Sequence, residues 1–299
     1  MQEIIDEFCW TKNKQRITKD KHLVPGLGNF THYTHTFSTP PAPLHFHSNI
    51  IEIHCMVKGS LHNQIEKDGV ITNYTTLGNQ AFISYPFEIH GNGNEPLPPH
   101  EFYAFQIDVS NPHKLLGLNE EYSLELYKKL ITLNYHQAIL GATYFNNIRS
   151  AFNFFADLNN NSIKVGVQFL TCFLFNLQFL TPNLETHVTS IDSSIKESID
   201  YLMANISEEL QVSDLAAVTG YSLSRYKVKF KETMGITPAE YINLQKIENA
   251  KRQLADTNIS ITDIAINLGF SSVSYFSSVF KKYVSSTPQH YRKNHSSFL

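Results

Sequence analysis

The chain has 299 residues and 42% hydrophobic content, which is enough to bury about two domain cores. Its three cysteines are scattered and too few for a disulfide framework, so we expect a reducing compartment, the cytoplasm. A net charge of −3 argues by itself against nucleic acid as a partner, and the acidic residues among the first ten argue against a secretory signal peptide at this end.

Short β-prone segments fill the first third of the chain. They mix β-branched with aromatic residues and are separated by turns that contain glycine. The clearest segments cover residues 49–57, 60–66, 80–85 and 101–109. Strands at this spacing predict a small β-barrel or jelly roll, which we place at residues 1–118.

Several histidines and one glutamate within this predicted barrel follow a known pattern. The first cupin motif, H-x-H-x4-E-x6-G, is matched by four residues: His45, His47, Glu52 and Gly59. A second set resembles the second cupin motif: Gly78, Pro86, His90 and Asn94. Because side chains two residues apart on a strand share a face, His45 and His47 can contact the same ligand.

Two interpretations of these side chains stay open. Three imidazoles and one carboxylate can bind a divalent ion such as Zn, Mn, Fe or Ni, and the candidate ligands are His45, His47, His90 and Glu52. Alternatively, these groups bind an organic effector or satisfy one another inside the barrel. We expect no cofactor, and we take five residues as effector-binding: His45, His47, Glu52, Tyr85 and His90. The sequence does not determine the facing of Tyr85, nor that of four further candidates: His54, His62, Tyr103 and Gln106.

The next part of the chain has the apolar spacing of helices. We expect one helix over residues 121–133, a Phe-rich stretch that ends at residues 159–161, and a strongly apolar run over 162–180. Polar residues interrupt that run, which favours a buried or interface helix over a membrane span. Its surplus apolar surface fits packing on the barrel and a dimer contact equally well. We assign residues 119–181 to a helical dimerisation segment and 182–192 to a linker.

Two stretches near the C-terminus, 213–233 and 262–283, share one pattern. Each begins a helix with an aspartate, Asp214 or Asp263, where the helix dipole favours a negative charge. An aliphatic residue and an alanine follow, as close packing against a second helix requires. The duplication predicts two similar helical hairpins within an all-α domain, which we place at residues 193–299.

Both stretches then turn at a glycine, Gly220 or Gly269, that is followed by an aromatic residue and a serine. We expect Ser222 and Ser271 to be the N-caps of the second helices. This order is typical of the helix-turn-helix motif, whose second helix enters the DNA major groove.

One long helix is predicted between the two motifs, over residues 238–255, with Thr237 as N-cap and Pro238 in its first position. Its length of roughly 27 Å comes close to one turn of DNA, about 34 Å. The two recognition helices can therefore face successive major grooves.

The charge of the chain is unevenly distributed. Residues 221–299 hold 11 basic and 5 acidic residues, a net charge of +6, which leaves −9 for the rest. This asymmetry places the DNA-facing surface at the C-terminal end.

The C-terminal third resembles the AraC/XylS family of bacterial transcription regulators. The resemblance covers residues 195–293 and rests on these positions: Phe230 and Lys231, 235–242, 261–265, Gly269 and Phe270, Tyr275 and Phe276, 280–282, and 287–292. Departures occur where the family commonly has Arg, at Val228, Lys246 and Ser278, and where it has Gly, at Ser285.

The resemblance implies which residues face DNA. Groove-facing residues map onto two sets: Ser224, Arg225, Lys227 and Val228, and Val273, Ser274, Ser277 and Ser278. Further basic residues are expected to contact phosphate: Lys229, Lys231, Lys281, Lys282, Arg292 and Lys293. A cupin-like sensor barrel and a homodimer are also implied by the resemblance.

We therefore expect an α+β multidomain protein: a cupin-like barrel, a helical dimerisation segment, and an all-α domain with two helix-turn-helix motifs. Its expected function is regulation of transcription through double-stranded DNA and RNA polymerase, as an activator on family grounds. The expected effector is a small molecule, and a sugar is favoured because the candidates mix His, Glu, Tyr and Gln with aromatic residues. No enzymatic activity and no membrane are expected. The alternatives are a metal-dependent cupin enzyme fused to a DNA-binding domain, and a regulator that responds to a fatty acid or a metal.

Overall fold

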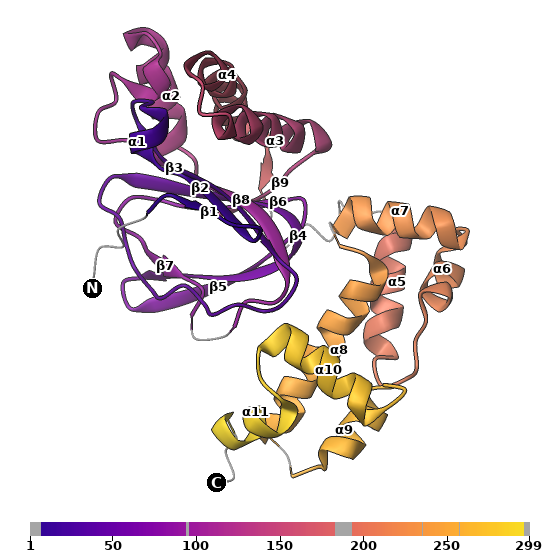
Figure 1. Ribbon diagram of the computed structural model, residues 1–299. Helices are drawn as coiled ribbons and strands as arrows, with labels where there is room; N and C mark the ends of the chain where they lie inside the picture. The colour runs from indigo at the N-terminus through magenta and orange to yellow at the C-terminus, as the bar shows by residue number, and fades with distance from the viewer. Residues whose placement is uncertain (1–6, 94–95, 183–192, 235, 257, 296–299) are drawn as a thin grey trace. The chain divides into compact units, whose positions relative to one another are not determined.

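The computed structural model describes residues 7–93, 96–182, 193–234, 236–256 and 258–295. It divides into two compact units, one made of most of residues 1–184 and one made mainly of residues 185–299. The first unit contains the strands and the second is helical (Figure 1).

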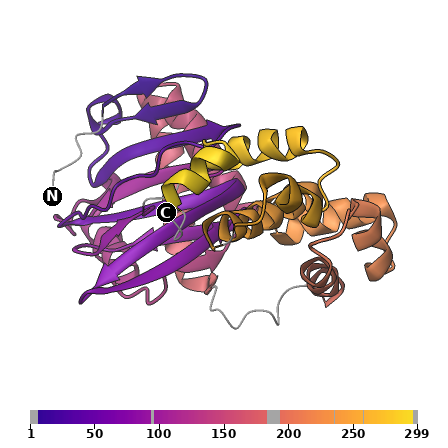
Figure 2. The same cartoon turned by 90° about the horizontal axis from the view of Figure 1, so that it is seen from below.

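The first unit is built on an antiparallel sheet with the strand order β1-β2-β3-β8-β4-β6-β9-β10, and β5 and β7 pair with β4. Figure 2, seen from below, shows these strands, coloured indigo to purple, running side by side. The strands are β1 (Cys9–Trp10), β2 (Lys14–Ile17), β3 (Leu27–His35), β4 (Ile50–Lys67), β5 (Val70–Leu77), β6 (Gln80–Ser84), β7 (Ile89–Gly91), β8 (His100–Asp108), β9 (Gln137–Ile139) and β10 (Thr181–Pro182).

Strand β4 joins two layers of this unit. Its first half pairs with β8 and β6, and its second half pairs with β5 and β7. The sequence predicted separate strands at 49–57 and 60–66, which was wrong, because the chain continues through Gly59, at φ 85°, without leaving the sheet. A bulge between Met56 and Lys58 marks the change of layer. The predicted strands at 80–85 and 101–109 are confirmed as β6 and β8.

Helices cover the outer side of one layer, and the layer of β5 and β7 lies on its other side (Figure 1). They are α1 (Lys19–His22), α2 (Glu120–Ile131), α3 (Ala142–Ala156) and α4 (Asn160–Asn176), with two 3-10 turns, η1 (Leu115–Gly117) and η2 (Leu177–Phe179). Strand alternation points Ile51 and Ile53 into the same apolar core as Phe105 and Phe155. The opposite face of β4 carries Glu52, so the polar residues lie between the two layers.

The predicted helices of the middle region are confirmed as α2, α3 and α4, and Asn159 caps α4 by accepting a hydrogen bond from the Asn161 N–H. By length and composition alone, the segment Asn160–Phe179 could cross a membrane, and a third of its most apolar window is buried. Its buried residues Leu170 and Phe173 belong to the core of the first unit.

The second unit consists of seven helices within the described residues: α5 (Ser193–Ala204), α6 (Val212–Thr219), α7 (Leu223–Met234), α8 (Pro238–Asp256), α9 (Ile261–Asn267), α10 (Val273–Val284) and α11 (Pro288–His295). Both predicted hairpins and the helix between them are confirmed. Thr237 and Glu240 form a reciprocal cap at the start of α8, since each side chain accepts a hydrogen bond from the other's backbone N–H.

One predicted cap was wrong. Ser222 accepts a hydrogen bond from the Arg225 N–H at 3.4 Å, as expected. In the second hairpin, however, the N-cap is Ser272 and not Ser271, because the turn after Gly269 is one residue longer, and Ser272 Oγ lies 3.1 Å from the Tyr275 nitrogen.

Three predicted features lie outside the described residues. They are Asn94 of the second cupin-like set, Gly235, and the linker apart from Pro182.

Candidate sensing cluster and nucleic-acid interface

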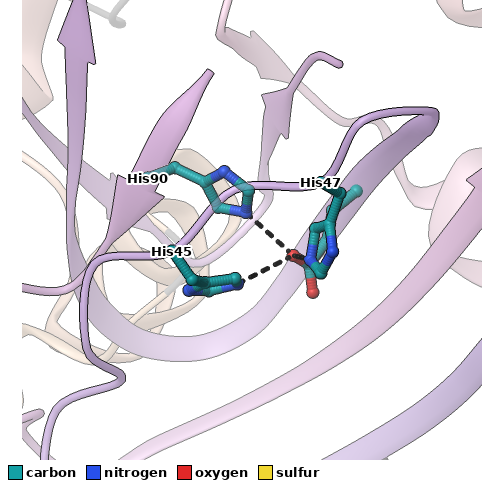
Figure 3. Close-up of side chains that lie close together, drawn as sticks. His45, His47 and His90 are labelled. Atoms are coloured by element: carbon teal, nitrogen blue, oxygen red, sulfur yellow. Dashed lines mark hydrogen bonds and ion pairs between the residues drawn. The ribbon is translucent and has the colours of Figure 1, made fainter. Parts of the chain in front are cut away.

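Four of the predicted effector-binding residues come together between the two layers of the first unit (Figure 3). His45 and His47 precede β4, Glu52 lies near the start of β4, and His90 lies on β7. Two backbone hydrogen bonds join His45 and His90, with N···O distances of 2.9 and 2.8 Å. A Cβ on Gly91 would lie 2.8 Å from the Pro43 oxygen, so glycine permits this close approach.

The imidazoles converge on one carboxylate oxygen. The Nε2 atoms of His90, His47 and His45 lie 3.1, 3.8 and 4.0 Å from Glu52 Oε2. The other carboxylate oxygen, Oε1, lies 3.3 Å from His54 Nε2. The ligand atoms of the four residues all lie within 4.8 Å of one another.

Backbone carbonyls fix the orientation of two of the rings. His45 Nδ1 lies 2.8 Å from the Pro43 oxygen, and His90 Nδ1 lies 2.9 Å from the Glu88 oxygen. A carbonyl oxygen only accepts hydrogen bonds, so Nδ1 carries the proton in both rings. Nε2 is therefore the atom that each ring presents to the cluster.

The carboxylate of the cluster is held in its charged form. Burial alone would raise the pKa of Glu52, but hydrogen bonds from His54 and His90 hold that pKa well below its ordinary value. Burial lowers the pKa of His45. For His90, burial acts to lower the pKa, but the hydrogen bond and charge of Glu52 outweigh it, so the pKa of His90 is raised.

The fifth predicted effector residue is placed elsewhere. The Tyr85 hydroxyl donates a hydrogen bond to the Tyr135 carbonyl oxygen at 2.6 Å, and its ring packs near His136. His54 joins the cluster instead, and its position two residues after Glu52 on a strand is the sequence signal for this. Tyr103 stacks on His32, and His62 interacts with Thr75 on β5.

Gln106 lies opposite Glu52 on β8 and lines an open pocket beside it. The pocket has a volume of about 20 Å³, roughly the space of one water molecule. Arg16 and Tyr33 also line it, and the Arg16 guanidinium donates to the Tyr33 hydroxyl at 2.8 Å.

The two recognition helices of the second unit each have one buried and one accessible face. Tyr226 and Phe230 of α7, and Phe276 and Phe280 of α10, are fully buried. The residues predicted to face DNA are exposed or half-buried: Ser224, Arg225, Lys227, Val228, Lys229, Lys231, Val273, Ser274, Ser277, Ser278, Lys281 and Lys282. The Arg225 guanidinium lies over the Tyr221 ring, 4.8 Å from the ring centre. This cation–π contact holds the Arg225 side chain in place at the start of α7.

A lysine ties the two hairpins together. Lys246 of α8 is only 4% exposed, and its Nζ donates hydrogen bonds to the carbonyl oxygens of Glu208 and Gly269 at 3.0 and 3.2 Å. Glu208 precedes the first hairpin and Gly269 is the turn of the second. A Cβ on Gly269 would overlap the Glu208 carbonyl oxygen, so the two segments are in direct contact. Burial lowers the pKa of Lys246.

The sequence singled out Lys246 only as a departure from a family pattern. Its position between Ile242 and Ala250 on the buried face of α8 was the available signal, because helical spacing places all three on one side.

Residues 215–294 match a family model described as a helix-turn-helix domain. The chain is 36% identical over 105 residues to the regulatory protein PocR of Salmonella typhimurium, and the match covers 35% of each protein. It is 28% identical over 201 residues to an HTH-type transcriptional regulator of Staphylococcus aureus, which covers 64% of this chain. The match spans only 27% of the length of that relative.

Among solved structures, the chain is similar to an AraC-type transcriptional regulator from Chromobacterium violaceum. The sequence identity is 29%, the match covers 36% of this chain and 96% of that one, and the TM-score is 0.33.

Proposed function

We propose that this chain, whose C-terminal unit is a helix-turn-helix domain of the AraC type, is a sequence-specific regulator of transcription. The observation that carries the proposal is the pair of helix-turn-helix hairpins, each with an accessible second helix, held on a single helix, α8. Because α8 has 19 residues, it is about 28 Å long, close to one turn of DNA. Both second helices can then contact one face of a duplex.

Base readout is assigned mainly to the first hairpin. Arg225 and Lys227 can donate to base edges or to phosphate, whereas the small residues of α10 favour contact with thymine methyl groups or recognition of DNA shape. Lys281 and Lys282, in the last turn of α10, are assigned to phosphate.

The first unit is proposed as the regulatory part, a cupin-like barrel over residues 1–118 followed by a helical dimerisation segment over 119–181. The two-layer sheet and the enclosed His/Glu cluster support this assignment. The effector is proposed to be a small molecule, with a sugar as the first candidate, and it acts by favouring one arrangement of a homodimer on DNA. We also propose that the regulator acts in the cytoplasm and activates transcription by recruiting RNA polymerase. The relatives named above are regulators, so no enzymatic step is included.

The test is binding to duplex DNA measured by fluorescence anisotropy at several salt concentrations, with a sequence selected from a random library and an unrelated duplex. Arg225→Ala should weaken binding to the selected sequence by about 1–3 kcal/mol. The matched control is Lys128→Ala, which removes an exposed cation from α2 of the first unit and should leave binding unchanged. Equal binding of both duplexes by the native chain would contradict the proposal.

A further inference from the structure

We infer that strand β5 is a docking edge for a second copy of this chain, which pairs antiparallel with it through the backbone of residues 71–75. The pairing makes one continuous sheet across the two copies. The inference goes beyond the proposed function, because β5 lies outside the segment assigned to dimerisation. It holds whether or not the helices of that segment also pair.

Strand β5 is the second half of a tight hairpin. Two residues, Asp68 and Gly69, join it to β4, and both have a positive φ, 53° and 76°. Turns of this kind match the twist of the two strands, and every residue of β5 pairs with β4. Near the end of β5, the Thr76 hydroxyl accepts hydrogen bonds from the side chains of Asn63 and Gln137, each at 2.9 Å. The strand is therefore fixed in its extended form before a partner binds.

Alternate residues of β5 direct their backbone groups away from β4. Val70 lies opposite Lys67 across the two-residue turn, and such a pair exchanges both backbone hydrogen bonds. The alternation along the pair then leaves the N–H and C=O groups of three residues pointing outward: Ile71, Asn73 and Thr75. The Leu77 N–H, next in this series, already donates to the Gln80 side chain at 2.8 Å. Within the part of the chain that the structure describes, β5 pairs with β4 alone, so residues 71–75 form an open edge.

The edge of β5 lacks the features that protect other edges of the sheet. Among the described strands, β1 and β10 at the two ends of the main sheet have two residues each, and β10 contains Pro182. By contrast, β5 has eight residues, and residues 70–87 contain no charged side chain. Short strands, prolines and charges are what normally prevent pairing between sheet edges. A long uncharged edge is therefore suited to accept another strand.

The sequence of the edge is complementary to itself. Residues 71–75 read Ile-Thr-Asn-Tyr-Thr. When two copies pair antiparallel about a two-fold axis at Asn73, Ile71 of one copy meets Thr75 of the other, and Asn73 meets Asn73. Every outward-facing residue then faces an outward-facing residue, so three pairs each exchange two backbone hydrogen bonds. Because β-branched residues meet at both ends and two amides meet at the centre, no like charges oppose each other. This symmetry favours a second copy as the occupant.

Apolar side chains beside the edge add to the contact. Val70 is 65% exposed and Ile71 is 50% exposed, so pairing removes apolar surface from water. Three pairs of residues make a small interface, and we expect it to be weak in solution. Two copies that are bound at neighbouring sites on DNA have a high effective concentration, which strengthens the pairing. Only this last effect rests on the proposed function.

The experiment measures the mass of the purified full chain by sedimentation velocity from about 1 to 100 μM. Asn73→Asp and Asn73→Lys each place two like charges against each other at the axis. Each variant alone should lower the weight-average mass at the highest concentration by about half. An equimolar mixture of the two variants should regain the native mass, because opposite charges then face each other. Pairing of the helices does not alter this expectation, since loss of one two-fold contact halves a closed assembly in either case.

The matched controls are Asn13→Asp and Asn13→Lys, which make the same changes at an exposed asparagine in the turn before β2. Both should keep the native mass. Hydrogen exchange gives an independent measurement on the native chain. The outward N–H groups of Ile71, Asn73 and Thr75 should exchange more slowly at 100 μM than at 1 μM, and this dependence should be absent in Asn73→Asp.

Three results would overturn the inference. The first is a native chain whose mass and exchange rates do not change with concentration, which would leave an extended segment of another protein as the occupant of the edge. The second is association of both Asn73 variants like the native chain. The third is a loss in each variant without recovery in the mixture, because an axis at Asn73 requires that recovery. None of these results depends on DNA binding, so the proposed function stands or falls separately.

Discussion

The molecule buries charge in two places and in two different ways. In the second unit, the Lys246 ammonium is 4% exposed and donates to two backbone carbonyls, so a cation is satisfied by acceptors from both hairpins. In the first unit, four imidazoles lie around the single carboxylate of Glu52, so an anion is surrounded by titratable side chains. Backbone carbonyls cannot change their charge, so the first arrangement serves architecture, whereas imidazoles gain or lose a proton, so the second can change with pH.

Replacing the glycine of the second hairpin should have the largest effect. Gly269→Ala places a Cβ against the Glu208 carbonyl oxygen and forces alanine to φ 60°, so we expect a loss of about 3 kcal/mol in the stability of the second unit. The measurement is urea unfolding followed by circular dichroism at 222 nm.

Gly220→Ala is the matched control, because Gly220 holds the equivalent turn position at φ 69° with open space around it. That change should cost only about 1 kcal/mol of backbone strain. Equal losses in the two variants would show that the contact between the hairpins does not stabilise the unit.

Removing the buried ammonium group of Lys246 should have the second-largest effect on stability. Lys246→Met leaves the Glu208 and Gly269 carbonyl oxygens without their donor, and we expect a loss of about 2 kcal/mol in the free energy of unfolding. DNA binding should weaken as well, because the two recognition helices lose their common anchor. Lys246→Arg should restore most of both. A methionine variant with native stability would remove Lys246 from the account of how the hairpins are held.

Removing a hydrogen-bond partner of the buried carboxylate should have a smaller effect, confined to the first unit. His54→Ala leaves Glu52 Oε1 without the His54 Nε2 atom that lies 3.3 Å away, and we expect a loss of about 1.5 kcal/mol in the free energy of unfolding of the first unit. Thermal unfolding measures the change, and the DNA affinity of the folded variant should equal that of the native chain. A variant with native stability would show that His54 does not stabilise the charged form of Glu52.

The smallest effect concerns the cap of α10. Ser272→Ala removes the acceptor of the Tyr275 N–H and should cost about 1 kcal/mol, whereas Ser271→Ala should change stability by less than about 0.5 kcal/mol. Thermal unfolding of the two variants side by side distinguishes them. The reverse order would restore Ser271 as the cap that the sequence alone suggested.

The ease of prediction differed between the two units for a physical reason. Helices form through contacts three or four residues apart, so α7, α8 and α10 could be predicted from the spacing of residues such as Tyr226 and Phe230. The cap of α10 was missed because a turn that is longer by one residue leaves no trace in apolar spacing.

The cluster in the first unit depends on contacts between distant parts of the chain. The H-x-H-x4-E spacing identified His45, His47 and Glu52, but His90 reaches them through the pairing of β7 with β4, 25 residues apart at Ile65 and His90. The sequence predicted Tyr85 as an effector-binding residue in the same way as the histidines. In the folded chain its hydroxyl donates a hydrogen bond to the Tyr135 carbonyl oxygen, a contact that depends on strand pairing. The facing of His54, by contrast, follows from the two-residue strand period that it shares with Glu52 on β4.

The central claim, that two linked hairpins read DNA together, is tested most directly by selection of binding sequences from a random duplex library with the purified full chain. The account predicts one enriched sequence with two separate conserved blocks whose centres lie about 10 base pairs apart, one helical turn. It also predicts that Arg225→Ala relaxes only one of the blocks. A single conserved block, or binding with no preferred sequence, would contradict it.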